Sequence, residues 1–204
     1  MGAITLGRQL WRPEGRLSRV LQRALWGIPL ILAAALGAAY SDYLSAKQKL
    51  DLIESGRLQA GSRVDLSLRE LNAYAQREVP PGVRNPRIQV VAPGVARGTA
   101  MVDFGKVRRA EGYEPGWLMS KLLDGERPVG VTVRIRSAAG QATVDVQRVE
   151  VSGIVVDGRT LDFLIRNILL AMYPDAVVGR PFDLGHRIQR LDVAPAAVGV
   201  LIGR

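Results

Sequence analysis

The side chains able to do acid–base, nucleophilic or metal chemistry are few in this sequence. His186 is the single histidine and cysteine is absent, so the chain has neither a second imidazole for a metal site nor a thiolate nucleophile. No serine near His186 forms a nucleophile motif. Asp103, Asp145 and Asp192 occur singly on strand faces that alternation assigns to solvent, whereas a glycosidase needs two carboxylates across a cleft. We therefore predict no catalytic residue, no metal site and no cofactor, and expect a protein that is not an enzyme.

The elements around these residues begin with an uncharged segment near the N-terminus, residues 24–40, which reads ALWGIPLILAAALGAAY. An α-helix rises 1.5 Å per residue and needs about 20 apolar residues to cross a bilayer. Trp26 and Tyr40 lie near its ends, as interfacial anchors do, and five arginines precede it, which predicts a cytoplasmic N-terminus. The predicted division of the chain is a basic cytoplasmic tail at 1–23, a transmembrane helix at 24–44, a juxtamembrane stalk and linker at 45–62, and an exported α+β domain at 63–204.

Two other interpretations of this segment stay open. Gly37 and Ala39 provide small residues for cleavage of a signal peptide after Ala39, but the apolar run exceeds the roughly 7–15 residues of a signal core, so an uncleaved anchor in the inner membrane is favoured. A buried helix of a soluble protein does not account for the arginines. The net charge of +9, from 28 basic and 19 acidic residues, favours an anionic partner. Because an exported domain would not meet DNA, we expect a membrane lipid and no nucleic acid.

The exported region begins with local structure that short motifs predict. "VDLS" is a short alternating strand, and Ser67 is the expected N-cap of a helix whose capping box Glu70 completes. "VPPGV" ends this helix because proline cannot continue it. "RIQVVA" and "GTAMVDF" then alternate as a hairpin with one apolar face.

The strongest β-signal follows, over "VGVTVRIRSAAGQATVDVQRVEVSGIVV". Apolar residues alternate on both sides of the AAG turn, and the alternation slips near Gln147 and Arg148, where a β-bulge would keep all of them on one face. Thr160 is predicted to cap an amphipathic helix that lies on that face, and "RLDV" and "VGVLI" form two final strands. The expected fold class is α+β, a curved antiparallel sheet wrapped around an amphipathic helix, preceded by one N-terminal transmembrane helix.

The order of these features resembles the exported lipid-binding proteins of the LmeA and YpmS type, within the wider tubular lipid-binding and AsmA-like group. The likeness covers roughly residues 63–204 and rests on two phrases, "LSLRELN" for the family's "LTEAELN" and "GRPFDLGHRI" for its "PF-LP-GI". The matching positions are Leu66, Glu70, Leu71, Asn72, Pro181, Phe182, Leu184 and Ile188, while Gly185 and Arg187 replace the family's Pro and Gly. The resemblance implies a curved sheet around a helix, with an apolar groove that holds acyl chains.

These patterns give two sets of candidate site residues. The candidate lining of a lipid groove is Val131, Val133, Ile135, Val144, Val146, Leu164, Ile168 and Met172. A basic rim at one end of the sheet, able to attract lipid head groups, would consist of Arg84, Arg87, Arg97, Arg108 and Arg109. We therefore expect a membrane-anchored cell-envelope protein whose exported domain binds or transfers a lipid.

Other functions stay open on the sequence alone. The same apolar residues would fill a closed core, which would leave a non-enzymatic envelope scaffold or interaction module with another envelope protein as its partner. A hydrolase acting on envelope polymers would need a role for His186 or for one of the strand aspartates.

Overall fold

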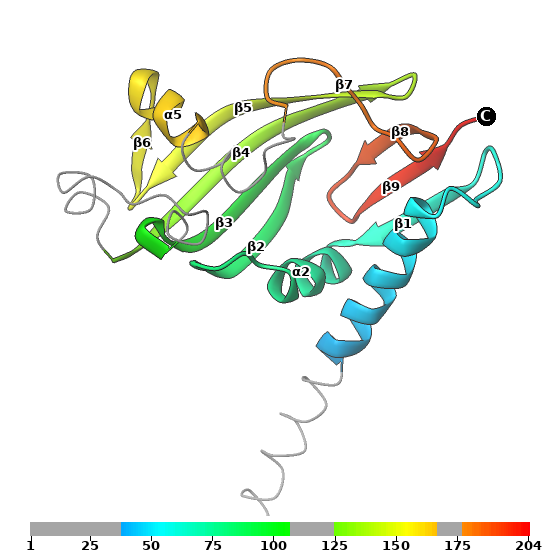
Figure 1. Cartoon of the computed structure of the whole chain (residues 1–204), viewed down its shortest axis with the longest axis horizontal. Helices are drawn as coiled ribbons and strands as arrows, with labels where there is room; N and C mark the ends of the chain where they lie inside the picture. Colours follow the sequence, from blue (N-terminus) through cyan, green and yellow to red (C-terminus); the bar gives the residue numbers. More distant parts are fainter. Residues whose placement is uncertain (1–37, 107–124, 167–176) are drawn as a thin grey trace, which may run out of the picture. The chain divides into compact units, whose positions relative to one another are not determined.

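The fold is α+β, with two antiparallel sheets and few helices (Figure 1). The computed structural model describes residues 38–106, 125–166 and 177–204. The strands are β1 (Arg63–Ser67), β2 (Val83–Ala92), β3 (Val95–Asp103), β4 (Glu126–Ala138), β5 (Gln141–Val151), β6 (Ile154–Val156), β7 (Phe182–Asp183), β8 (Ile188–Val193) and β9 (Ala197–Ile202). Among the described residues, helix is found over residues 38–54, in α2 (Leu68–Arg77), over residues 104–106 and in α5 (Gly158–Leu164).

Most of the N-terminal prediction falls outside the described residues, which begin at residue 38. The predicted tail at 1–23 and residues 24–37 of the predicted span lie in that part. Among the described residues, no helix combines the length and the apolar composition that crossing a bilayer requires. Residues 38–44, the end of the predicted span, are described and belong to the helix over residues 38–54.

The segment predicted as a stalk and linker, residues 45–62, contributes to the core of the domain. Its residues Ala46 and Ile53 are buried, and they pack in one cluster with residues of β1 and β9. The apolar spacing on this helix is therefore the spacing of a face that packs on a sheet. The folded domain begins before Arg63, where the sequence analysis placed its start.

The smaller sheet has the strand order β1-β9-β8. The predicted final strand pair is confirmed, because β8 and β9 are antiparallel neighbours with Leu191 opposite Val200. Strand β1 completes this sheet by pairing with β9, with Leu66 opposite Val198. This pairing joins the two ends of the domain and was not predicted.

The larger sheet has the order β2-β3-β4-β5-β6, and β7 pairs with β5. Both predicted hairpins are confirmed, β2 with β3 and β4 with β5. In the second hairpin Thr132 lies opposite Arg148 and Val133 opposite Val146, which leaves Gln147 as the extra residue of the predicted bulge. The bulge restores the phase of the alternation, so one face of this sheet is apolar along β4 and β5.

The two predicted helix starts have different outcomes. The capping box is confirmed, since the Ser67 side chain accepts from the Glu70 amide and the Glu70 side chain accepts from the Ser67 amide. The predicted N-cap at Thr160 is wrong. The chain leaves β6 directly into α5, so the extended residue Asp157 (φ −135°, ψ 178°) occupies the N-cap position, without a side-chain capping hydrogen bond.

Two polar side chains fix strands that have no strand neighbour on one side. Asn72 of α2 donates to the Ile88 carbonyl at 2.9 Å and accepts from the Ile88 amide at 2.7 Å, as a neighbouring strand would do at the edge of β2. Ser137 of β4 bonds both the amide and the carbonyl of Leu191 in β8, at 2.8 and 3.0 Å. These bonds satisfy edge groups that would otherwise be open to another chain.

Candidate functional site

The larger sheet has one apolar face, and it carries the described candidates for the groove lining. Residues opposite each other on antiparallel strands share a face, and Val131, Val133 and Ile135 of β4 lie opposite Val149, Val146 and Val144 of β5. All five candidates on these strands are half-buried. The candidate Leu164 of α5 packs on the Val102–Phe104 cluster. Four predicted site residues lie outside the described part of the chain: Ile168, Met172, Arg108 and Arg109.

An apolar groove with a volume of about 450 Å³ lies at one side of this face. It runs between the end of α2, the following turn and the apolar sides of β2, β3 and β4. Its lining from α2 and the turn includes Tyr74, Val79 and Pro80, and β2 adds Val83 and Ile88. The volume falls within the range of about 300–1,000 Å³ that is usual for small-molecule sites.

The position of this groove differs from the predicted lining. Of the described residues predicted as groove lining, only Val131 lines it, because the groove lies toward β2 and α2, away from the hairpin of β4 and β5. In the sequence, "VPPGV" is interpreted only as a helix stop, although its Val79 and Pro80 form part of the groove wall. An apolar Val-Pro pair directly after an amphipathic helix was the available signal.

The charged groups of the groove lie at the end of α2 and on β2. Glu78, the C-cap residue of α2, and Arg87 of β2 both line it. The Tyr43 hydroxyl donates to Glu78 at 2.8 Å. The groove thus combines a mostly apolar wall with a few polar groups, the usual composition of a site for an amphipathic ligand.

Two of the three described members of the predicted basic rim form ion pairs. Arg84 contacts Glu126 at 2.9 Å, and Arg97 contacts Glu150 at 2.5 Å. Arg97 lies on the polar face of the sheet, since it faces Thr132 on β4. Arg87 is the described member of this set that lines the groove.

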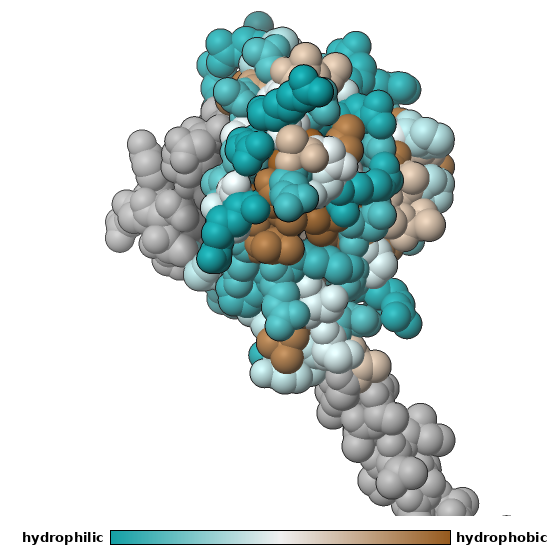
Figure 2. Space-filling model, turned by 90° about the vertical axis from the view of Figure 1, so that its right-hand side faces the viewer, coloured by the Kyte–Doolittle hydropathy of each residue, from teal (hydrophilic) through white to brown (hydrophobic). Residues whose placement is uncertain are grey.

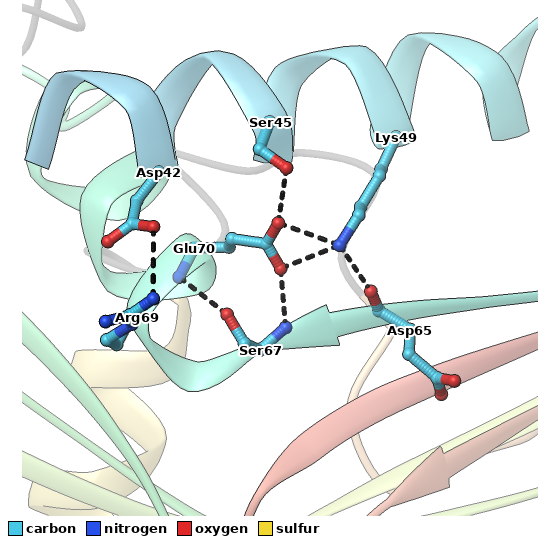
Figure 3. Close-up of polar contacts among 7 residues, drawn as sticks. All are labelled: Asp42, Ser45, Lys49, Asp65, Ser67, Arg69 and Glu70. Atoms are coloured by element: carbon cyan, nitrogen blue, oxygen red, sulfur yellow. Dashed lines mark hydrogen bonds and ion pairs between the residues drawn. The ribbon is translucent and has the colours of Figure 1, made fainter. Parts of the chain in front are cut away.

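A buried carboxylate joins the helix of residues 38–54 to α2 (Figure 3). Glu70 is 7% exposed, and its oxygens accept from Lys49 Nζ at 2.7 and 2.9 Å and from Ser45 Oγ at 2.5 Å. Burial alone would raise the pKa of Glu70. The hydrogen bonds from Lys49, Ser45 and Ser67 outweigh that effect and lower this pKa from 4.5 to about 2.

This cluster is suited to holding two helices together. Both carboxylate oxygens are occupied, since the Ser67 amide also donates to Glu70 at 2.8 Å, and Lys49 reaches the Asp65 carbonyl at 2.7 Å. A general acid or base needs a free lone pair or proton near pH 7, and Glu70 has neither. The sequence predicted Glu70 as a cap but not its partners Lys49 and Ser45, which precede it by 21 and 25 residues.

The residues first considered for chemistry are not arranged as a reactive site. The three strand aspartates are each paired with a basic side chain: Asp103 with Lys106 at 3.2 Å, Asp145 with Arg136 at 2.6 Å, and Asp192 with Arg63 at 2.6 Å. His186 Nδ1 lies 2.9 Å from the Glu54 carbonyl oxygen. In the part of the chain that the structure describes, no three His, Cys, Asp or Glu side chains are placed to hold a metal ion.

His186 lies in a second hollow of about 610 Å³, which it forms with neighbours such as Arg187 and Gln189. The view toward the end of the domain that carries β8, β9 and the C-terminus shows a largely hydrophilic surface with a few apolar patches (Figure 2). This hollow has a more polar lining than the groove. The groove beside α2 is therefore the better candidate for a site that binds an apolar ligand.

No family model matches the chain, and comparisons with curated proteins and with solved structures find no similar protein. The resemblance to exported lipid-binding proteins therefore stays a prediction. The case for a function rests on the sequence and on the geometry of the groove.

Proposed function

We propose that this chain is a single-pass protein of the inner membrane whose exported domain binds or transfers a membrane lipid, with an acyl chain in the apolar groove. The N-terminus is cytoplasmic and the anchor lies within residues 24–44. The observation that carries the proposal is the open apolar groove of about 450 Å³ beside α2. Each buried methylene contributes about 0.8 kcal/mol, so part of an acyl chain suffices for binding.

The proposal includes the finer architecture expected for such a domain, in which the larger sheet curves around a covering helix. Leu164 of α5 packs on the cluster of Val102 and Phe104, next to Val129. A bulge at Gln147 increases the local twist of β5. The half-buried valines of β4 and β5 extend the apolar surface beyond the groove, along which a longer chain would run.

Photolabelling in a bilayer tests this proposal with the full chain. The protein is reconstituted in phosphatidylethanolamine–phosphatidylglycerol vesicles that contain a phospholipid with a diazirine in its acyl chain, and labelled peptides are mapped by mass spectrometry. We expect labels on groove residues such as Ile88 and Val131, in addition to labels on residues 24–40. Labels on that segment serve as an internal control for insertion.

A substitution that fills the groove is the decisive test. Gly98 lines the groove, and a Cβ at this position would meet no atom within 4 Å, so Gly98→Phe places a ring in the groove without a clash at its first atom. Gln89→Phe puts the same ring at an exposed position on β2 that faces away from Ile88. We expect a loss of groove labelling of at least about tenfold in Gly98→Phe only, as one ring displaces several methylenes. Equal labelling in both variants, or no groove labelling in the parent chain, would contradict the proposal.

One observation favours a second candidate function, an interaction module for another envelope protein. Strand β6 is an edge of the larger sheet, and its Ile154 and Val155 side chains are 71% and 48% exposed. Apolar residues on an open edge suit strand addition by a partner. Under this function Ile154→Lys would abolish co-purification of a partner, while Gly98→Phe would leave it intact.

A further inference from the structure

A ladder of aromatic rings and one arginine joins the start of the helix over residues 38–54 to α2. The ring centroids of Tyr40 and Tyr43 are 6.5 Å apart, and Tyr43 stacks on Tyr74 at 6.1 Å. The guanidinium carbon of Arg77 lies 5.3 Å from the Tyr40 ring centroid and 5.4 Å from that of Tyr43. These distances are within the range of cation–π contacts. The four residues are called the aromatic ladder below.

The aromatic ladder is continuous with the groove. Tyr74 belongs to the ladder and lines the groove, and Ala75 and Glu78 continue the same wall. Tyr43 reaches this wall twice, by stacking on Tyr74 and by its hydrogen bond to Glu78. The ladder and the groove therefore share the Tyr74 ring, so a ligand that approaches over the ladder reaches the groove wall there.

The aromatic ladder also adjoins the segment that we propose as the anchor. Tyr40 is the last residue of the uncharged run, and Tyr43 follows it in one continuous helix, about 4.5 Å further along the axis. The head-group layer on each side of a bilayer is roughly 5–8 Å thick. Both tyrosines therefore fall within that layer when the run spans the bilayer, and tyrosine is enriched there.

The exposed side of this helix start fits a lipid interface. Tyr40 is 50% exposed and Leu44 is 41% exposed, so the domain leaves apolar and aromatic surface uncovered where the chain would meet the bilayer. The bilayer is the occupant that the position of the ladder indicates, because Tyr40 is the last residue of the uncharged run that is proposed to span it.

We infer that the aromatic ladder is a membrane-contact surface in the head-group layer, and that the groove takes its lipid directly from the bilayer that anchors the chain. This inference rests on the proposed function, since it requires both the anchor and the groove. The Arg77 guanidinium, which contacts both the Tyr40 and the Tyr43 ring, would then lie near the lipid phosphates, as interfacial arginines do. The route from bilayer to groove then passes over Tyr43 and Tyr74.

The absence of cysteine gives a direct test by site-directed spin labelling. Gln76→Cys places a single label on α2 beside Arg77, and Gln59→Cys places one beyond the far end of the helix over residues 38–54, about 20 Å from the ladder. Both positions are exposed glutamines. The full chain is reconstituted in phosphatidylethanolamine–phosphatidylglycerol vesicles containing a lipid with a nickel-chelating head group. We expect several-fold stronger paramagnetic relaxation at position 76 than at position 59.

A loading measurement tests the second half of the inference. The double variant Tyr40→Ser, Arg77→Gln removes exposed parts of the ladder without changing the groove lining. The control Leu52→Ser, Arg57→Gln makes similar changes at exposed positions near the other end of the same helix. We expect the ladder variant to slow photolabelling of the groove from the bilayer several-fold and to leave labelling in detergent micelles unchanged. The control is expected to load at the parent rate.

The outcomes separate this inference from the proposed function. Equal, weak relaxation at positions 76 and 59, or an unchanged loading rate in the ladder variant, would overturn the inference while groove labelling upholds the proposed function. Extraction of the parent chain from vesicles by alkaline carbonate would overturn both, because the anchor would be absent. Strong relaxation at position 76 together with slowed loading supports both.

Discussion

Substitution of Glu70 by glutamine tests the physical account of how the helix over residues 38–54 is held to α2. Glutamine keeps the size of the side chain but replaces one acceptor oxygen by a donor. In the native cluster the two oxygens accept from Lys49, Ser45 and the Ser67 amide. In Glu70→Gln the side-chain amide group therefore faces hydrogen-bond donors, and Lys49 loses the opposite charge. Both changes destabilise the folded state because the position is buried.

The magnitude follows from the pKa of the carboxylate. One pKa unit corresponds to about 1.4 kcal/mol, so lowering the pKa of Glu70 from 4.5 to about 2 stabilises the folded state by about 3 kcal/mol above the unfolded pKa. The Lys49 side chain is 34% exposed, and solvent screening reduces the expected loss to about 2–3 kcal/mol. A lowered pKa contributes its stability above pH 4.5 and loses it as the pH falls toward 2.

The assay is urea unfolding of the full chain in mild detergent, followed by far-ultraviolet circular dichroism. We expect Glu70→Gln to reduce the free energy of unfolding by about 2–3 kcal/mol near pH 7, and by only about 1 kcal/mol near pH 3. Glu54→Gln is the matched control, since Glu54 is an exposed residue at the end of the same helix, and we expect a change within about 0.5 kcal/mol.

Two results would refute this reasoning. A loss below about 1 kcal/mol near pH 7 would mean that the buried ion pair contributes no more than a surface pair. A loss that stays constant between about pH 7 and pH 3 would mean that packing of the side chain, and not ionisation of Glu70, is responsible.

Further predictions concern the polar side chains that fix strands and use the same unfolding assay. Asn72→Leu leaves two backbone groups at the edge of β2 without partners and is expected to lower the free energy of unfolding by about 2–3 kcal/mol. The control Gln76→Leu, at an exposed position on the same helix, should change it by less than about 0.5 kcal/mol. Equal effects of the two substitutions would contradict the role of Asn72. Ser137→Ala removes both bonds to Leu191 and should cost about 1–2 kcal/mol, against a near-neutral Gln141→Ala on the neighbouring strand. A neutral Ser137→Ala would mean that water replaces the hydroxyl.

Part of the fold follows from residues that are close in the sequence. The capping box depends on Ser67 and Glu70, three positions apart, and it forms as predicted. The bulge at Gln147 follows from the slip in alternation between neighbouring apolar positions of β5. Such features are predictable because the interacting groups are held close together by the covalent chain.

The partners of polar side chains were not predictable in the same way. Glu70 was expected to cap α2, but the pairing with Lys49 depends on how a separate helix docks. In the sequence, Asn72 is only a polar position on a predicted helix. Its side chain bonds the edge of β2, as a neighbouring strand would, because β2 packs beside α2 in the folded domain. The predicted N-cap at Thr160 fails for a related reason, since the exit from β6 sets where α5 begins.

The sequence by itself determined most of the strands, where the bulge lies, and that one face of the larger sheet is apolar, because alternation and turn residues encode these features locally. The tertiary structure decided what lies against that face. The tertiary structure pairs β1 with β9. It also places the groove beside Tyr74 and Val79, and not on the hairpin of β4 and β5. Apolar periodicity identifies a surface that is buried on folding. It carries no information about which distant element covers that surface, or about which part of the surface stays exposed.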